Sequence, residues 1–360
     1  MKLRLGLVGL SSDWTSRYVP ALRVLRDRFE VVAVYNSVSA LADRAAQEFE
    51  ADHYDSFREL LARDDIDAAM MLEGGWYGTV PIDAACDSGK AVYCGNEIRF
   101  DPQLAAQLKQ RVDGAGIAFM AEFPRRYAPA TLRLKELIAT HLGAPQLLFC
   151  HHRLQADANL AQRRGSSKQS QIDEKLTIAN RIDRELVELI DWCSFIAGNS
   201  VRSVQSTSHI PFAATTLTED AETCGDFPDY QSLSVDLSPP NFPIGSTVAQ
   251  ISCGAYIPSV WSEAINFRPP AAIQVCCENG VAFLDLPNGL TWFDDAGRHR
   301  ESLDAELSVG QQLLTQFHRA VTSLVRKMGD LEDVCRSLQT LDNAKRSARE
   351  RRAIDMECSQ

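Results

Sequence analysis

The first turn of the chain carries an altered phosphate-binding pattern. In the pattern G-x-G-x-x-G, glycines let the backbone approach a pyrophosphate at the start of a helix. The same six positions here read Gly9-Leu10-Ser11-Ser12-Asp13-Trp14, which keeps only the first glycine. The Ser11 side chain leaves a phosphate less room to approach the backbone, although its hydroxyl can donate a hydrogen bond. The Asp13 carboxylate competes with a phosphate for the same backbone amides. The pattern therefore predicts NAD or NADP binding at Gly9, Ser11, Ser12 and Asp13 that is weak or lost. The alternative is that Ser12 or Asp13 only caps an ordinary helix.

Two later strand ends add candidate cofactor contacts. Asn36 stands where a ribose-binding Asp or Glu is expected, and its amide would repel a 2′-phosphate less than a carboxylate does. The second candidate is the stretch Glu73-Gly74-Gly75-Trp76-Tyr77, which follows a strand at the carboxyl edge where open α/β sheets bind ligands. Its glycines permit a ligand to approach the backbone closely, and its two aromatic side chains can stack on a ligand ring. The alternative is a flexible loop whose two aromatic side chains only pack against the protein.

A pair of histidines offers acid–base chemistry. His151-His152-Arg153 lies on a predicted strand, where alternation sends His152 to one face and His151 with Arg153 to the other. Either histidine is a candidate proton acceptor or donor. The alternative is an interface residue with satisfied hydrogen bonds.

The elements that position these residues change character along the chain. Up to about residue 122, near-continuous apolar strands alternate with helices, which indicates a parallel sheet covered on both faces. The strands are expected at Lys2 to Leu10, Glu30 to Tyr35, Asp67 to Leu72, Ala91 to Cys94 and Ile117 to Glu122. The helices are expected at Trp14 to Arg28, Ser39 to Phe49, Phe57 to Ala62, Val80 to Asp87 and Asp101 to Asp113.

The remainder favours an antiparallel sheet that is open on one side. Period-2 alternation recurs in strands expected at Gln146 to Arg153, Leu233 to Leu237, Ala249 to Cys253, Ile273 to Cys277 and Val281 to Leu286. A helix is expected from Arg184 to Ile196, two helices close the chain, and Ala156 to Glu174 is expected to be a surface loop. The predicted fold class is α/β: a Rossmann-type parallel domain followed by an α+β domain with a largely antiparallel open sheet.

Length and composition exclude several classes of function. A chain of 360 residues suits two cores, and the net charge of -11 disfavours nucleic acid. No segment predicts a signal peptide or a membrane span, so we expect a cytoplasmic protein without a membrane partner. The ten cysteines form no C-x-x-C pair, which indicates small buried residues and no metal site.

Several segments resemble the Gfo/Idh/MocA oxidoreductase family. Tyr54 to Leu61 with Asp64 to Ala68 is similar to the stretch before that family's fourth strand, and Gly89 to Cys94 to its glycine-lysine strand. Arg125-Arg126-Tyr127 with the helix Ala128 to Ile138 is similar to the link into its second domain, and Arg346 to Glu350 to its last helix.

The resemblance also implies catalytic positions, and both differ here from the family pattern. The Glu-Lys-Pro triplet, whose lysine lies beside substrate and nicotinamide, maps onto Gly95-Asn96-Glu97; Asn96 carries no charge and cannot shuttle a proton. The Asp-x-Gly-x-His helix motif becomes Arg184 to Glu188, so Glu188 stands in place of the histidine and Arg184 in place of the carboxylate. Glu188 in a partly dry cleft could act as a base, or the two form an ordinary i,i+4 ion pair.

The resemblance implies an NAD(P)-dependent oxidoreductase acting on a sugar, polyol or related compound. One alternative is an enzyme with reassigned chemistry, in which Glu188, His152 and Arg126 surround a small carbonyl or sugar substrate. The other is an inactive or repurposed scaffold that keeps the fold. The domains are expected at residues 1–125 and 126–360, and the last helix is a candidate to pack back on the first. We expect a homodimer or homotetramer through the C-terminal sheet, because Tyr256, Ile257, Val260, Trp261 and Trp292-Phe293 supply interface aromatics and aliphatics.

Overall fold

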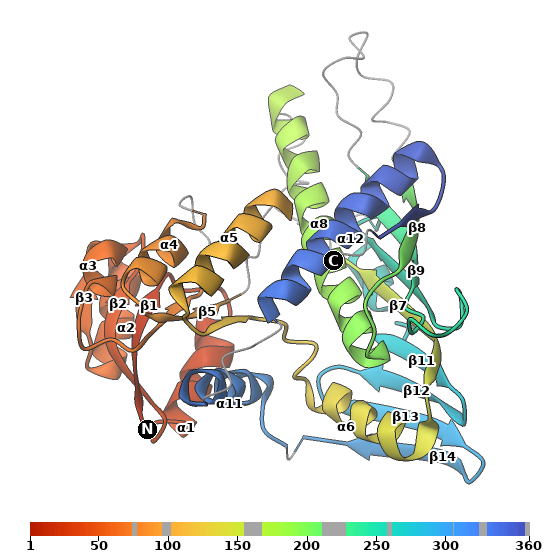
Figure 1. The fold of residues 1–360 in the computed structure, drawn as a ribbon, viewed down its shortest axis with the longest axis horizontal. Coiled ribbons are helices and arrows are strands. Elements are labelled where there is room, and N and C mark those ends of the chain that lie inside the picture. The colour runs from red at the N-terminus through yellow and green to blue at the C-terminus, as the bar shows by residue number, and fades with distance from the viewer. Residues whose placement is uncertain are drawn as a thin grey trace. The chain divides into compact units, whose positions relative to one another are not determined.

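The computed structural model describes residues 1–73, 78–95, 102–154, 168–210, 228–257, 261–304, 306–323 and 330–356. Its compact units are Met1–Pro129 with Ala305–Leu338, and Ala130–Asp304 with Gln339–Gln360. Figure 1 shows the ribbon of both units. Within these described ranges, no helix combines the length and apolar character that crossing a membrane requires.

The first unit contains a wholly parallel sheet, as the sequence predicts. In its described residues the six strands run in the order β3-β2-β1-β4-β5-β6, the doubly wound order that places a switch point between β1 and β4. The strands are β1 (Leu3–Val8), β2 (Phe29–Tyr35), β3 (Asp52–Tyr54), β4 (Ala68–Met71), β5 (Ala91–Cys94) and β6 (Phe119–Ala121).

Helices cover both faces of this sheet. One face packs against η1 (Trp14–Tyr18), α1 (Val19–Val24), α2 (Ser39–Phe49) and α11 (Val309–Thr322), which together build one apolar core. The other side carries α3 (Phe57–Leu61), α4 (Val80–Asp87) and α5 (Pro102–Ala115). Gly6 of β1 permits the close approach there, because a β-carbon on it would lie 2.5 Å from Leu60. The helices expected at Ser39 to Phe49 and Val80 to Asp87 are confirmed at both ends.

The helix expected from Trp14 to Arg28 is wrong in kind and length. It opens with one π-helical turn, in which the Val19 N–H donates to the Trp14 carbonyl, and it ends at Val24. Trp14 is buried and packs 5.7 Å from the Phe49 ring. A wider turn accommodates this large side chain where the usual pattern has a small glycine.

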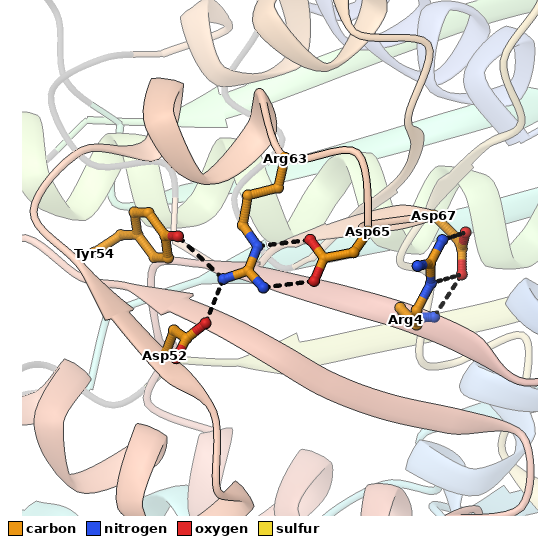
Figure 2. Close-up of polar contacts among 6 residues, drawn as sticks. All are labelled: Arg4, Asp52, Tyr54, Arg63, Asp65 and Asp67. Atoms are coloured by element: carbon orange, nitrogen blue, oxygen red, sulfur yellow. Dashed lines mark hydrogen bonds and ion pairs between the residues drawn. The ribbon is translucent and has the colours of Figure 1, made fainter.

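An ion-pair cluster fixes the amino-terminal edge of the sheet. Arg4 of β1 forms a two-pronged pair with Asp67, at 2.8 and 3.1 Å, just before β4 begins. Arg63 donates to Asp65, to Asp52 of β3 and, at 3.1 Å, to the Tyr54 hydroxyl (Figure 2). Tyr54, Asp65 and Asp67 belong to the segments that resemble the family, and here they connect β3 and β1 to the residues just before β4.

The second unit is built on a large, mostly antiparallel sheet. Among the described residues its nine strands run in the order β14-β13-β12-β11-β7-β10-β9-β8-β15, with β7 and β10 parallel. They are β7 (Pro145–Arg153), β8 (Ser203–His209), β9 (Tyr230–Asp236), β10 (Val248–Gly254), β11 (Ile273–Cys277), β12 (Gly280–Asp285), β13 (Gly289–Asp294), β14 (Gly297–Ser302) and β15 (Ile354–Asp355). The five strands predicted from alternation are confirmed; β8, β13, β14 and β15 were missed.

Helices flank this sheet. They are α6 (Pro129–Leu137), η2 (Ile138–Leu142), α8 (Lys168–Ala197), the short α10 (Ser262–Asn266) and α12 (Asp330–Glu350), whose residues from Gln339 on belong to this unit. Of these, α8 packs on β7 and β10. The loop expected from Ala156 to Glu174 is wrong beyond its midpoint, because α8 already begins at Lys168. A polar composition is compatible with a helix as well as with a loop, so composition alone gave the wrong prediction for residues 168–174.

Candidate functional site

The turn after β1 has the geometry of a ligand-binding turn. Gly9 adopts φ +76°, and its N–H donates to the Tyr35 carbonyl of β2 at 2.8 Å. A β-carbon on Gly9 would lie 2.7 Å from the Glu73 β-carbon, so the first glycine is retained for both conformation and space. Gly9, Ser11, Asn36 and Glu73 therefore lie at the carboxyl ends of β1, β2 and β4, as predicted for the cofactor contacts.

Two polar atoms near this turn have unused hydrogen-bonding capacity. Asn36 is only 5% exposed, and its Oδ1 accepts the Val38 N–H at 2.8 Å, whereas its Nδ2 is buried without a hydrogen-bond partner in the described structure. The buried Ser11 Oγ is likewise without one in the same described region. Buried polar groups are normally hydrogen-bonded, so these atoms fit a ligand that brings acceptors such as ribose hydroxyls and phosphate oxygens.

Asp13 lies at the N-cap position of η1, but its side chain makes no capping hydrogen bond. Its carboxylate lies 2.8 Å from Arg17 Nη2 one turn later. Asp13 therefore occupies the N-cap position, but its carboxylate pairs with a cation on its own helix and does not cap the backbone. Ser12 is exposed beside it.

Arg17 also reaches a residue that the sequence analysis did not single out. Glu122, directly after β6, accepts hydrogen bonds from Arg17 Nη1 and from the Tyr18 hydroxyl, and its side chain is fully buried. Burial lowers the pKa of Arg17, but the carboxylates of Glu122 and Asp13 outweigh it and hold that pKa above its ordinary value. The i,i+4 spacing of Asp13 and Arg17 could have revealed half of this network; Glu122 is 105 residues away from Arg17.

In the second unit, His152 faces the helix α8. Its Nε2 lies 3.5 Å from the Glu185 carboxylate, and the two side chains are 37% and 18% exposed. Glu188 and Arg184, the residues in place of the family's helix motif, are half-buried on the same helix. Glu185 is thus the acidic partner that the sequence analysis overlooked, because i,i+4 spacing drew attention to its neighbours.

His151 lies on the other face of β7, as alternation predicts. Its Nδ1 is 2.6 Å from Ser252 Oγ and its Nε2 is 3.1 Å from the Tyr256 hydroxyl, beside a cavity of about 350 Å³. Burial lowers the pKa of His151, with a further contribution from Arg153, so the ring favours its neutral form.

Arg126 belongs to the first unit and is buried. Its guanidinium lies 3.0 Å from Asp333 and 4.9 Å from the Phe123 ring centre. The positive charge of Arg126, which the sequence analysis assigned to substrate binding, is therefore paired with a carboxylate of its own unit.

Several predicted site residues cannot be placed. Asn96, Glu97, Gly74, Gly75 and Trp76 lie outside the described residues. Over the described ranges, no three His, Cys, Asp or Glu side chains gather as a metal site would require.

Comparisons with known proteins agree with this arrangement. Residues 3–123 match the Gfo/Idh/MocA model, described as an oxidoreductase family with an NAD-binding Rossmann fold. The chain is 28% identical over 145 residues to D-xylose 1-dehydrogenase (NADP(+)) 2 of Haloferax volcanii, covering 39% of this chain and 42% of that protein. It is 27% identical over 160 residues to inositol 2-dehydrogenase of Paracoccus denitrificans, covering 42% and 46%. These matches span less than half the length of either relative.

The fold likeness extends over the whole chain. The aldose-aldose oxidoreductase of Caulobacter crescentus superposes with a TM-score of 0.77 at 12% identity, covering 99% of this chain and 100% of that one. At this identity the likeness concerns the fold alone. Over residues 3–123 the chain is thus similar to the Gfo/Idh/MocA oxidoreductase family, and the first unit has the 3-2-1-4-5-6 sheet order of a Rossmann fold.

Proposed function

We propose that this protein is an NAD(P)-dependent oxidoreductase acting on a hydroxyl or carbonyl group of a sugar, a polyol or a related compound. The observation that carries the proposal is the pair of unused polar atoms, Ser11 Oγ and Asn36 Nδ2, beside the Gly9 turn. They lie where doubly wound folds hold a dinucleotide. The two relatives, a D-xylose dehydrogenase and an inositol dehydrogenase, support the substrate class.

The second unit supplies an acid–base pair. When bound, the nicotinamide would accept or donate a hydride, and the reaction then needs a group that takes or returns the hydroxyl proton. His152 suits this role because the Glu185 carboxylate, 3.5 Å from Nε2, can stabilise the positive charge of a ring that has accepted a proton. Glu188 and Arg184 are on the same helix and are the proposed substrate contacts.

The test is turnover of an aldose and polyol panel, including D-xylose and myo-inositol, with NAD and with NADP. We expect His152→Ala to lower kcat by roughly 10²–10⁴-fold and Glu185→Gln by a smaller factor. His209→Ala is the matched control, since His209 forms a comparable pair with Asp229 at 2.7 Å but is 62% exposed on β8. Unchanged turnover in His152→Ala would remove His152 from the mechanism.

A second candidate function is a non-catalytic binding protein that keeps the fold. The Asp13–Arg17 pair favours it, because it places a carboxylate in the turn that a pyrophosphate would approach. This second function would be supported if the native chain binds NADH but neither it nor any variant turns over any substrate of the panel.

The open face of the second sheet supports a homodimer or a homotetramer. Leu147, Phe149 and Phe293 project from it with about two-fifths of their surface exposed, at 43%, 42% and 43%, and Tyr256 and Trp261 are also exposed. Trp292 points to the inner side, where it is buried and stacks on His299 at 4.8 Å, so alternation leaves Phe293 as the surface aromatic of that pair. Large, partly exposed apolar side chains on a sheet face suit burial against a second copy.

Light scattering tests this assembly. We expect a mass of at least twice 39.9 kDa for the native chain and a shift toward the monomer for Phe149→Asp. Val24→Asp is the control, because Val24 is also exposed but lies on α1 of the first unit. A native chain that scatters as a monomer at micromolar concentration contradicts the assembly.

A further inference from the structure

Three charged side chains connect the Gly9 turn with the end of β6. Arg17 lies between them, with Nη2 2.8 Å from Asp13 Oδ2 and Nη1 donating to Glu122 Oε1. The exposed fractions of these side chains fall from 33% at Asp13 to 24% at Arg17 and 0% at Glu122. The guanidinium therefore has a buried partner on one side and a solvent-accessible partner on the other.

The buried partner fixes the position of the guanidinium. A fully buried carboxylate requires a counter-charge, and Tyr18 supplies Glu122 with a further hydrogen bond. The backbone of Glu122 is itself fixed, because its N–H donates to the Cys94 carbonyl of β5 at 2.8 Å. Arg17 is thus held at the carboxyl edge of the sheet, the edge where open α/β sheets bind their ligands.

The partner on the solvent side is exchangeable. Asp13 is partly exposed, and its pair with Arg17 within one helical turn contributes little net stability. Arginine binds phosphate oxygens in the same geometry as carboxylate oxygens. The unused Ser11 Oγ, two residues before Asp13, and the buried Asn36 Nδ2 independently indicate a ligand with acceptor oxygens at this edge.

We propose that Arg17 is the phosphate-binding residue of the first unit, and that a nucleotide phosphate replaces the Asp13 carboxylate on Arg17 Nη2. The inference rests on the proposed nucleotide function and specifies how it works in a turn that has lost two glycines. A charged side chain here takes over what backbone amides do in the usual pattern, and Asp13 acts as a built-in competitor.

A double-mutant cycle tests the exchange. Dissociation constants of NADH, NADPH and ADP are measured on the full chain by fluorescence or calorimetry for the native protein, Asp13→Asn, Arg17→Gln and the double variant. We expect Asp13→Asn to tighten binding about tenfold and Arg17→Gln to weaken it about tenfold, the range of a charge-assisted hydrogen bond. In the Arg17→Gln background, Asp13→Asn should change binding less than about twofold, because its effect acts through Arg17.

Two controls keep the cycle interpretable. Arg23→Gln removes a charge from the same helix at a 66% exposed side chain and should leave binding unchanged. Because Arg17→Gln leaves Glu122 buried without its cation, thermal unfolding is followed in parallel, and Arg17→Gln with Glu122→Gln repeats the measurement without that buried charge.

The outcomes separate this inference from the proposed function. If Asp13→Asn tightens nucleotide binding equally with and without Arg17, the Asp13 carboxylate repels the phosphate directly. That result would overturn the exchange on Arg17 but leave the proposed nucleotide binding intact. Native-like binding by folded Arg17→Gln overturns it as well. Absence of NADH, NADPH and ADP binding from all variants overturns both proposals together.

Discussion

The α-carbon of Gly9 faces the Glu73 side chain so closely that a β-carbon on Gly9 would lie 2.7 Å from the Glu73 β-carbon. Contacts of this length do not occur between real side chains, and the backbone of Gly9 at φ +76° disfavours any other residue. The retained glycine thus joins the ends of β1 and β4 at the edge that carries the candidate nucleotide site.

Substitution of Gly9 should damage stability and binding together. We expect Gly9→Ala to lower the unfolding free energy of the first unit by roughly 1–3 kcal/mol, from backbone strain plus the clash with Glu73. Denaturant unfolding and NADH titration measure the two effects. Gly114→Ala is the control, since a β-carbon on Gly114 of α5 meets nothing within 4 Å, and it should be neutral or stabilising. Equal stability of the two variants would contradict the close packing of Gly9 on Glu73.

The Arg4–Asp67 pair should give the first unit an acid-sensitive contribution to stability. Hydrogen bonds from Arg4 hold the pKa of Asp67 below its ordinary 3.8 (Figure 2). The folded pKa is therefore lower than the unfolded pKa, so the stabilisation is present above the ordinary value and is lost as the pH falls through the folded one.

Replacement of Asp67 tests this pH dependence. We expect Asp67→Asn to lower Tm by roughly 2–4 °C at pH 7, for a loss of about 1 kcal/mol. The difference from the native chain should shrink at pH values below 3.8. Asp64→Asn, exposed in the same segment, is the control. If the Tm difference between Asp67→Asn and the native chain stays constant as the pH falls below 3.8, the ion pair with Arg4 does not cause it.

The thiols of Cys94 and Cys277 should resist alkylation in the folded chain. Burial raises the pKa of each to about 12, with smaller contributions from Glu122 for Cys94 and from Cys276 for Cys277. Because the thiolate is the reactive form, iodoacetamide at pH 8 should leave both unmodified while the denatured chain reacts. Peptide mapping also measures labelling of Cys276, which is partly exposed on the opposite face of β11. The Cys276 thiol should react before those of Cys94 and Cys277. Labelling of Cys94 as fast as Cys276 contradicts this prediction.

A buried hydrogen bond anchors the helix that carries Glu185. The Trp192 indole N–H donates to the Thr131 hydroxyl at 3.0 Å, and both residues are almost completely buried. We expect Thr131→Val to lower the unfolding free energy by about 1–3 kcal/mol, because the indole N–H loses its acceptor without access to water. Thr140→Val removes an exposed hydroxyl that contacts the Glu136 carbonyl of the preceding turn and the neighbouring His141 ring, and it should change the unfolding free energy by less than about 0.5 kcal/mol. Similar losses in both variants would show that the buried bond adds nothing.

Local patterns were sufficient for much of the fold. Apolar runs and 3.6-residue periodicity predicted the parallel sheet and the bounds of α2 and α4, and alternation predicted the five central strands of the second sheet. These signals are local, because each residue's burial follows from its position on its own element. They failed at β14 and at the start of α8, where polar residues suit more than one backbone conformation.

The candidate site depended on contacts that sequence spacing does not encode. The sequence identified Gly9, Asn36 and His152 through the positions that strand ends and alternation assign them. Only the tertiary structure brought Glu122 to Arg17 and Glu185 to His152, and it turned Asp13 from an unopposed charge into one member of a network. The pKa and the binding properties of a charged side chain depend on its burial and on its nearest partner. The partners of Arg17 and His152 come from other helices and strands that fold against their own. Glu122 is 105 residues away from Arg17 in the sequence.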